Sequence, residues 1–567
     1  MRKKVTLIGA SIVALSLTSA ALAQSDPTDP TPPASPTPTP AEEECGPGTN
    51  NCSIVDQDGT GLSVSVDQTG NGNVSNVEQE DIGRVANVTQ SGDNNVSDID
   101  QVGTFPGGNT GSIATVTQSG TNAQSYILQD GTGLGSPFQS RVTVTQTGDS
   151  GESVVRQTGS RNTSATINQD GDSFSYVEQS GLTLDSFARV NQSGGDGNNA
   201  IVFMQQNNSR VNTLTQVGNM NNSEVYQLSG GRSGQVNARQ TGDRNDSIII
   251  QAQTDNNDSL RAQVIQTGND NISSLVQTGN NGSPNAAFAG QMANIAQSGN
   301  DNLSRVEQDI DLIGGDTNRL QVAQNNDGND SFIQQNAGGG FIDIVQTSTD
   351  TSGSVSGTGV LNIFDSTAMT DVFDNVRANF SRVVTDGFGI TQATLRQTGF
   401  GNRSDIRQST NNISPVQQVF VTQEGERQNS DVLQDFGANL ATVRQGVGVM
   451  GSSDNNSVVE QSLGINNIAF VDQIGTFNEA QVAQDGGSGQ DANIDQDGTG
   501  GFSGIFQTGA GPNDANSIQT ATSDSVISLI FQDGTSNVAT VTQSGTGDFS
   551  NVDQSGTGNS AVVNQGS

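Results

Sequence analysis

Glutamine recurs every eleven residues through most of this chain. The interval holds near both ends of the sequence, at Gln57, Gln68, Gln79, Gln90 and Gln101, and again at Gln532, Gln543, Gln554 and Gln565. Similarity at a short fixed period is typical of repeat architectures, in which each unit packs mainly against its neighbours. The repeat therefore constrains the fold more than any other property of the sequence.

Alternate positions before each glutamine share a chemical character. The residue two before is β-branched in the first repeats, as in Val66 and Val77; the residue four before is usually small, as in Ser75 and Ala86. Asparagine often stands six before, at Asn73, Asn95, Asn537 and Asn559. Alternate residues point to one face of a strand, whereas a helix would scatter them. The residue just before the glutamine is variable and polar, so we expect the other face to meet water.

These features predict an all-β fold, a two-sheet parallel β-solenoid. Each strand would be followed by Gln-x-Gly, where glycine supplies the positive φ of a tight turn. Two eleven-residue units would form a coil of about 22 residues, and successive coils would pair in parallel at roughly 4.8 Å. Stacked Gln and Asn amides would then hydrogen-bond in ladders, since a buried unpaired amide costs about 1–3 kcal/mol. About 20 such coils would give a rod on the order of 100 Å.

The N-terminal residues predict export. Arg2, Lys3 and Lys4 precede an apolar run with small residues before position 24, which is typical of a secretory signal peptide over residues 1–23. No other stretch approaches the roughly 20 apolar residues that span a bilayer, so we expect no membrane span. Residues 24–52 form a linker rich in Pro, Thr and acid, in which Cys45 and Cys52 can close a local disulfide.

The repeats divide into two arrays. We assign residues 53–346 to the first, 347–391 to a non-repeat insertion and 392–567 to the second, and the first includes Gln205, Gln216 and Gln227 in its register. Apolar residues between Met369 and Val384 have helical spacing. They predict an amphipathic helix over 366–384; an irregular insertion is the alternative.

Composition argues against catalysis and against nucleic acid. The chain has no histidine, which excludes Ser-His-Asp and Cys-His arrangements and His-ligated metals. No acid stands out from the repeat, so we predict no catalytic, cofactor or metal residues, and no enzyme. Without its signal peptide the chain has 19 arginines against 59 acids, a net charge of about −40. Nucleic acid and anionic membranes are poor partners for such a surface.

One repeat phrase resembles a known family. The spacing of Gln554, Gly556, Asn559, Ala561 and Gln565 is similar to the curlin repeat. A second match consists of Gln532, Gly534, Asn537, Ala539 and Gln543. The resemblance implies a secreted subunit that polymerises with itself as curli-like cross-β fibres on the bacterial surface and supports adhesion and biofilm matrix. It also implies a nucleating partner and an outer-membrane export factor. Curlin has only a few repeats, whereas this chain has several times as many, interrupted by insertions, and its N-terminal segment differs from that of curlin.

Other functions remain as alternatives. A non-polymerising acidic β-solenoid adhesin is the main one. Asp56, Glu78 and Asp100 should form one column of carboxylates, and calcium or low pH would relieve the repulsion between them. A solvated acidic face is the simpler interpretation. Thr-x-Thr arrays such as Thr115 and Thr117 suggest ice binding, which we rank below calcium.

The last repeats predict where a polymer would grow. Because little follows Gln565, we expect an open strand edge there, ready to pair with another copy. Replacing Val541, Val552 and Val563 by Asp should cap growth, whereas removing residues 534–567 should only slow assembly modestly.

Overall fold

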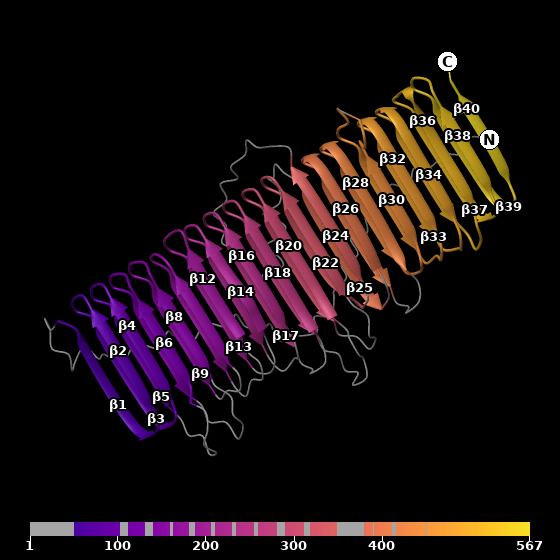
Figure 1. The fold of residues 1–567 in the computed structure, drawn as a ribbon. Coiled ribbons are helices and arrows are strands. Elements are labelled where there is room, and N and C mark those ends of the chain that lie inside the picture. The colour runs from indigo at the N-terminus through magenta and orange to yellow at the C-terminus, as the bar shows by residue number, and fades with distance from the viewer. Residues whose placement is uncertain are drawn as a thin grey trace, which may run out of the picture. The chain divides into compact units, whose positions relative to one another are not determined.

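The described part of the chain is built from strands stacked in two sheets. The computed structural model describes residues 50–566 except 103–110, 131–139, 159–162, 181–186, 206–209, 229–233, 254–258, 280–289, 311–317, 339, 349–378, 389–390, 411–415 and 450. Within these residues there are forty strands and no helix. Odd-numbered strands form one sheet, called sheet A, and even-numbered strands form the other, sheet B (Figure 1). The predicted two-sheet parallel β-solenoid is confirmed.

Sheet A contains β1 (Cys52–Thr60), β3 (Val74–Ile82), β5 (Val96–Val102), β7 (Gln124–Asp130), β9 (Glu152–Thr158), β11 (Phe174–Ser180), β13 (Asn199–Gln205), β15 (Asn222–Leu228), β17 (Asp246–Gln253), β19 (Ile272–Gly279), β21 (Leu303–Ile310), β23 (Asp330–Gly338), β25 (Phe380–Phe388), β27 (Arg403–Thr410), β29 (Asn429–Asp435), β31 (Asn456–Ser462), β33 (Glu479–Asp485), β35 (Phe502–Thr508), β37 (Ile527–Thr535) and β39 (Phe549–Thr557). Each strand pairs in parallel with the strand of the next coil.

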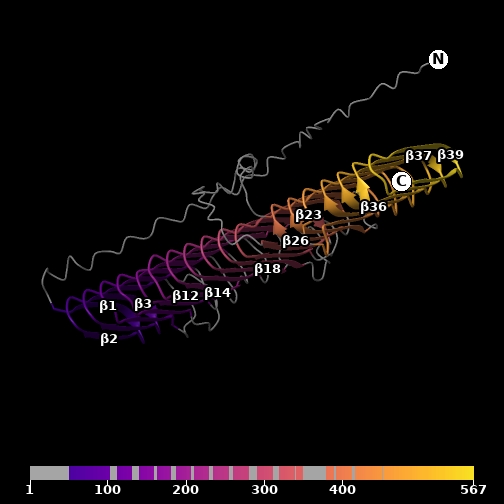
Figure 2. The ribbon, with the colours of Figure 1, turned by 90° about the horizontal axis from the view of Figure 1, so that it is seen from above.

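Sheet B contains β2 (Ser63–Thr69), β4 (Val85–Ser91), β6 (Ile113–Gln118), β8 (Arg141–Gln146), β10 (Ser164–Gln169), β12 (Phe187–Ser193), β14 (Arg210–Val217), β16 (Gln235–Thr241), β18 (Ser259–Thr267), β20 (Gly290–Ser298), β22 (Asn318–Asn325), β24 (Phe341–Ser348), β26 (Thr391–Phe400), β28 (Gln417–Glu426), β30 (Leu440–Gln445), β32 (Ile468–Thr476), β34 (Asp491–Thr499), β36 (Asp514–Asp524), β38 (Val538–Gln543) and β40 (Ser560–Gln565). Its strands are also parallel, and the coils follow one another regularly when seen from above (Figure 2).

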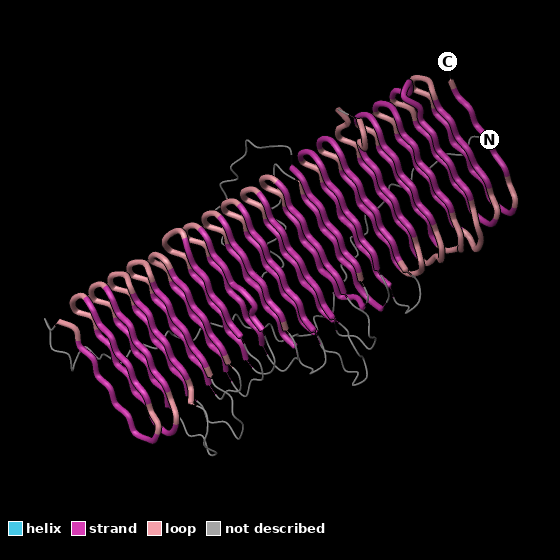
Figure 3. The backbone as a smooth tube through the Cα atoms, in the orientation of Figure 1, coloured by secondary structure: helices cyan, strands magenta, loops and turns pink. Residues whose placement is uncertain are grey.

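The register between coils keeps glutamine on glutamine. Gln57 lies opposite Gln79 in β1 and β3, 22 residues further along the chain, as the repeat predicts. Where a connection is longer, as between β5 and β7, Gln101 still lies opposite Gln129. Extra residues are therefore absorbed between strands, and the strands themselves stay in phase. Figure 3 shows this alternation of long strands and connecting loops.

The core is a thin layer between the sheets. The β-branched residues two before the glutamines, such as Val77 and Ile99, are fully buried, and so are the small residues four before, such as Ala86. Together they form one hydrophobic cluster that extends from Val77 to Val552. Pairing a branched side chain with a small one lets the two sheets approach closely over the whole stack.

Glycine at the turns is needed for the stacking itself. Gly242 follows the ladder glutamine Gln240 by two residues and has a φ of 112°. A Cβ on Gly242 would lie 2.0 Å from the carbonyl oxygen of Gly268 on the next coil. Both the backbone conformation and the close approach therefore exclude a side chain at this position.

The predicted non-repeat insertion is shorter than expected. Residues 380–388 form β25, which pairs with β23 and β27, so the predicted helix is wrong over 380–384. Ser381 and Val383 occupy the small and β-branched positions of the repeat, but Thr385 replaces the glutamine. The second array therefore begins at Phe380, and residues 349–378 lie outside the described part of the chain.

Candidate functional site

A glutamine ladder runs the full length of sheet B. Each Nε2 donates to the Oε1 of the glutamine one coil further along the chain, over distances from 2.7 to 3.3 Å. The ladder joins Gln68, Gln90, Gln118, Gln146, Gln169, Gln192, Gln216, Gln240, Gln266, Gln297, Gln324, Gln346, Gln397, Gln423, Gln445, Gln473, Gln496, Gln519, Gln543 and Gln565. Every strand of the sheet contributes one member, and the bonds all point the same way.

Sheet A carries a second ladder that is interrupted. Its hydrogen-bonded runs join Gln57, Gln79, Gln101, Gln129 and Gln157, then Gln227, Gln251, Gln277, Gln308 and Gln335, and then Gln408, Gln434, Gln461, Gln484, Gln507, Gln532 and Gln554. The sequence-predicted ladder residues are therefore sorted by the fold into two separate columns, one per sheet.

Two interruptions occur where another residue takes the glutamine position, and one lies between Gln157 and Gln179, which are opposite each other but have an unpartnered Nε2 and Oε1. Met204 lies opposite Gln179 and Gln227, and Thr385 lies opposite Gln335 and Gln408. The sequence register had placed Gln205 in this column, which is wrong, because Gln205 is exposed whereas Met204 is 1% exposed. As a result, the Oε1 atoms of Gln227 and Gln408, which follow Met204 and Thr385 in the column, are buried without a hydrogen-bond partner.

Each ladder glutamine of sheet B also ties the two sheets together. The Nε2 of Gln266 in β18 lies 2.9 Å from the carbonyl oxygen of Asp246, which begins β17 in sheet A. It lies 3.0 Å from the carbonyl oxygen of Asn271, which precedes β19. One side chain therefore links its own coil both to the next coil and to the opposite sheet.

Asparagine forms ladders of the opposite polarity. Asn271 donates its Nδ2 to the Oδ1 of Asn245 on the preceding coil at 2.9 Å, and Asn302 donates to Asn271 at 3.0 Å. The backbone N–H groups of the same residues donate to the same oxygens. Glutamine amides thus donate toward the C-terminal end of the stack and asparagine amides toward the N-terminal end. The repeat sequence predicted the stacking of both amides but not their opposed directions.

The predicted carboxylate column is present at the start of sheet A. Asp56 lies opposite Glu78, and Glu78 lies opposite Asp100. Burial, followed by the charge of Glu78, raises the pKa of Asp100. Burial, followed by the charge of Asp100, raises the pKa of neighbouring Asp98 to about 7. Among the described residues no group of three or more Cys, Asp or Glu side chains is arranged to hold a metal ion.

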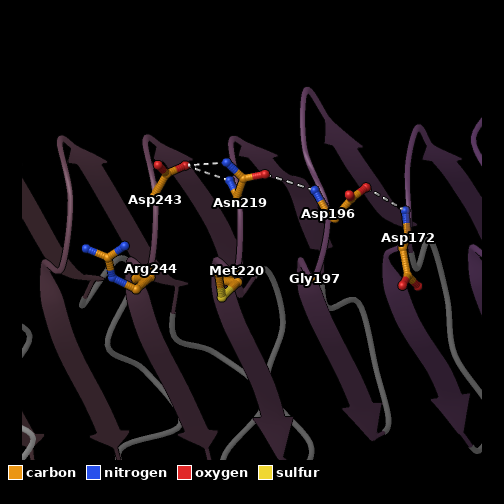
Figure 4. A pocket seen from close by; sticks show the side chains of 7 residues that line it. All are labelled: Asp172, Asp196, Gly197, Asn219, Met220, Asp243 and Arg244. Atoms are coloured by element: carbon orange, nitrogen blue, oxygen red, sulfur yellow. Dashed lines mark hydrogen bonds between the residues drawn. The ribbon is translucent and has the colours of Figure 1, made fainter.

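The turns from sheet B to sheet A form a shallow depression of about 410 Å³. Its lining residues are Asp172, Asp196, Gly197, Asn219, Met220, Asp243 and Arg244 (Figure 4). The backbone N–H of Asn219 donates to the Oδ1 of Asp243 at 2.8 Å, and that of Asp196 donates to the Oδ1 of Asn219 at 3.1 Å. Asp243 and Asn219 therefore bind the N–H groups of the preceding turns, and the first of these contacts lowers the pKa of Asp243.

The strands at the two ends of the stack each have one neighbour among the described residues. β39 pairs with β37 and β40 with β38, while β1 pairs with β3 and β2 with β4. In β40, Val563 packs against the core while Val562 points outward and is 67% exposed. In the same coil, Phe549 at the start of β39 is 57% exposed.

Neither the cysteines nor the comparisons with known proteins assign a function to the chain. Cys52 is disulfide-bonded, and Cys45 lies outside the described residues. In the part of the chain that the structure describes, no helix is long and apolar enough to cross a membrane. A scan against protein-family models finds no match, and a search of curated proteins finds no relative.

Proposed function

We propose that this chain is a secreted structural protein that assembles into curli-like amyloid fibres at the bacterial cell surface. The observation that supports it best is the unbroken glutamine ladder of sheet B, in which consecutive coils meet in register through identical amides. A stack in which each coil repeats the surface of the last can be continued by another copy at little cost in complementarity.

The direction of the ladder bonds gives the proposal a polarity. Gln565 at one end accepts from Gln543, and its Nε2 donates only to the carbonyl oxygen of Phe549 in its own coil. Gln68 at the other end donates to Gln90, and it is the first glutamine of the sheet B ladder among the described residues. In the glutamine ladder one end of the stack therefore offers amide donors and the other amide acceptors, and the asparagine ladder runs the opposite way. Copies would add head to tail, a heterologous contact that does not close on itself.

Adhesion, biofilm support, a nucleating partner and an outer-membrane export factor belong to the same proposal. They come from the resemblance of the repeat phrase to curlin, while the stacked coils supply the physical means of polymerisation. The acidic surface is consistent with a fibre kept soluble until it is nucleated.

The test uses the strand at the C-terminal edge of the stack. Val563 of β40 faces the core, and its neighbour Val562 faces outward, so V563D and V562D place the same charge on opposite faces of one strand. If the edge extends fibres, V563D should slow seeded elongation strongly, whereas V562D should leave it close to that of the unmodified chain.

Replacing Val541, Val552 and Val563 together by Asp is a less specific test of the C-terminal edge. Val541 of β38 is fully buried between β36 and β40, so an aspartate there would disrupt an internal coil as well as the edge.

Filament length is the measurement that decides. A single folded chain already contains cross-β spacings of about 4.8 Å, so thioflavin response and diffraction do not by themselves separate a monomer from a polymer. The mature chain, incubated at neutral pH and imaged by electron microscopy, should form filaments much longer than one stack. Particles that keep the length of one chain at all concentrations would favour the alternative, a non-polymerising acidic adhesin.

Added calcium tests whether the alternative, an acidic adhesin, responds to calcium. The stacked Asp56, Glu78 and Asp100 predict faster assembly or higher stability with added calcium if a cation relieves their repulsion. A flat response to calcium would remove this idea without touching fibre formation.

A further inference from the structure

Apolar side chains gather on the outward face of sheet A over β35, β37 and β39. They stand one, three or five residues before a ladder glutamine, so they point away from the core. Residues 451–566 are described without a gap, and Phe531 and Phe549 are 38% and 57% exposed. We call this surface the aromatic patch, and it consists of Phe502, Phe506, Ile527, Leu529, Phe531 and Phe549. A contiguous exposed apolar surface is typical of a binding site.

A glycine lets the side chains of the aromatic patch close into one surface. Gly504 lies opposite Leu529 in the register of β35 and β37. A Cβ on Gly504 would lie 2.9 Å from Cε2 of Phe506 and 3.1 Å from Cδ2 of Leu529. Both side chains therefore lean over the glycine. Phe506 also stacks on Phe531, with ring centroids 4.9 Å apart, and Asp553 takes the next place in this column on β39.

The part of the chain that carries the aromatic patch has acids but no cations. Residues 445–567 contain no arginine, lysine or histidine. The last arginine before them, Arg444, already pairs with Asp472 at 3.2 Å. The acids of residues 445–567 are Asp454, Glu460, Asp472, Glu479, Asp485, Asp491, Asp495, Asp497, Asp514, Asp524, Asp533, Asp548 and Asp553. A surface with charge of one sign attracts ligands of the opposite sign, so a partner of the aromatic patch should be basic.

Another part of sheet A shows which cation suits such a surface. Phe332, Arg382 and Asp405 stand in one column on β23, β25 and β27. The guanidinium carbon of Arg382 lies 6.0 Å from the ring centroid of Phe332, and its Nη1 lies 3.6 Å from Oδ2 of Asp405. One arginine thus contacts a ring and a carboxylate together. Rings of phenylalanine are also covered, at 5.3 to 5.8 Å, by Arg189, Arg305, Arg319 and Arg403.

The aromatic patch offers the same two groups without an arginine between them. Phe531 and Asp553 lie opposite each other on β37 and β39, and adjacent strands are about 4.8 Å apart. A guanidinium that approaches from solvent can therefore lie against the ring of Phe531 and reach the carboxylate of Asp553. We propose that the aromatic patch binds arginine side chains of a basic polypeptide.

Arginine suits this surface better than lysine does. Its planar guanidinium is more weakly hydrated than an ammonium group and stacks on aromatic rings. A second copy of the chain is a poorer occupant, because the large net negative charge makes copies repel one another. The inference concerns the single folded chain and does not rest on fibre formation.

Peptide binding to the freshly prepared mature chain tests the proposal. The probe is a fluorescent peptide of alternating glycine and arginine, compared by anisotropy at physiological ionic strength with the same peptide carrying lysine. The arginine peptide should bind more tightly. Phe531→Leu keeps an apolar side chain but removes the ring, so it should weaken binding of the arginine peptide about two- to fivefold. Asp553→Asn should weaken it by about 1.5- to fivefold, the range of an exposed ion pair.

Matched controls make the same changes on the opposite face of the stack. Phe470→Leu on β32 and Asp495→Asn on β34 alter outward residues of sheet B. Both should leave binding of the arginine peptide close to that of the unmodified chain. Amide exchange in β35, β37 and β39 should be the same in all four variants, which separates a lost contact from a disturbed fold.

Three results would overturn the proposal. Equal affinity for the two peptides would show attraction to acidic charge alone. Equal binding by Phe531→Leu and Phe470→Leu would place the peptide elsewhere on the chain. If Phe531→Leu reduced self-association in sedimentation without weakening peptide binding, a second copy would be the occupant of the aromatic patch.

Discussion

Gln266 is the clearest place to test whether the amide ladder holds the fold together. It is fully buried in β18, accepts from Gln240 at 2.8 Å and donates to Gln297 at 2.9 Å. Gln266→Ala removes both bonds and leaves a donor on Gln240 and an acceptor on Gln297 inside a layer that water does not reach.

The expected cost follows from those two groups. The carbonyl oxygens of Asp246 and Asn271 also lose a contact with Gln266, but that of Asn271 keeps its bond from the backbone N–H of Asp246. A buried polar group left without a partner costs about 1–3 kcal/mol, so two cost about 2–6 kcal/mol, before any contribution from the cavity. Gln266→Met fills most of the space and should recover the cavity contribution only.

Hydrogen exchange measures this loss where it occurs. In a stack whose coils contact mainly their neighbours, the free energy of opening should fall in β16, β18 and β20 and change little ten coils away. Gln263 of the same strand faces outward and is half-buried, so Gln263→Ala is the matched control, expected to change stability by less than about 0.5 kcal/mol. Equal protection in Gln266→Ala and Gln263→Ala would refute the idea that the ladder stabilises the stack.

Three further outcomes follow from the same geometry. Gly242→Ala should destabilise its coil by at least about 1–3 kcal/mol in thermal unfolding, because the new Cβ meets the oxygen of Gly268 at a positive φ; Gly547, with no atom within 4 Å, should tolerate alanine better. Met204→Gln should raise stability by about 1 kcal/mol, since the introduced amide can bond the unpartnered oxygen of Gln227. Because burial raises the pKa of Asp98 from 3.8 to about 7, its contribution to stability is full below pH 3.8 and is lost as the pH rises through 7. Asp98→Asn should therefore flatten thermal stability across that range.

The fold could be predicted because its determinants repeat. The alternation of residue types predicts a strand, the β-branched position identifies its inward face, and the glutamine spacing sets its register. The structure confirms each of these, as Val77 and Gln79 show. The ladder glutamines were found for the same reason. No single unit is distinctive, but a one-residue slip in any unit would place its core residues outside.

The two errors, the predicted helix and the position of Gln205, arose where another residue replaces the ladder glutamine. Phe380, Val383 and Val384 satisfy a helical spacing, yet Asn379, Ser381 and Val383 also follow the alternation of the repeat. Because Thr385 stands in place of the glutamine, the repeat could not be recognised in this strand from glutamine spacing. At Met204 a neighbouring glutamine, Gln205, suggested the wrong register, whereas the alternation of Ala200 and Val202 would have identified Met204 as the inward residue.

The apolar residues on the outward face of β7 to β17 could not be found from the core pattern, because they lie in the positions that the pattern leaves free. In the first repeats those positions hold Asp67, Glu78 and Thr89, which predicts a wet face. In β7 to β17 the outward positions hold Tyr126, Val154, Tyr176 and Ile201 three before the ladder residue, and Tyr226 and Ile250 one before it. Reading the outward residues as a separate series, coil by coil, would have shown the change.

The two faces of each strand therefore carry different kinds of information. Inward residues vary little, because every coil must accept and donate the same amide bonds to its neighbours, and a break such as Met204 leaves an unpartnered oxygen. Outward residues are free of that requirement and change from acidic at Asp100 to aromatic at Tyr176. If the chain polymerises, the inward face makes every copy alike, and the outward face alone can decide what each part of the fibre binds, covers or repels. A substitution that alters partner binding without altering amide exchange should consequently fall on outward positions, and one that alters both should fall on inward positions.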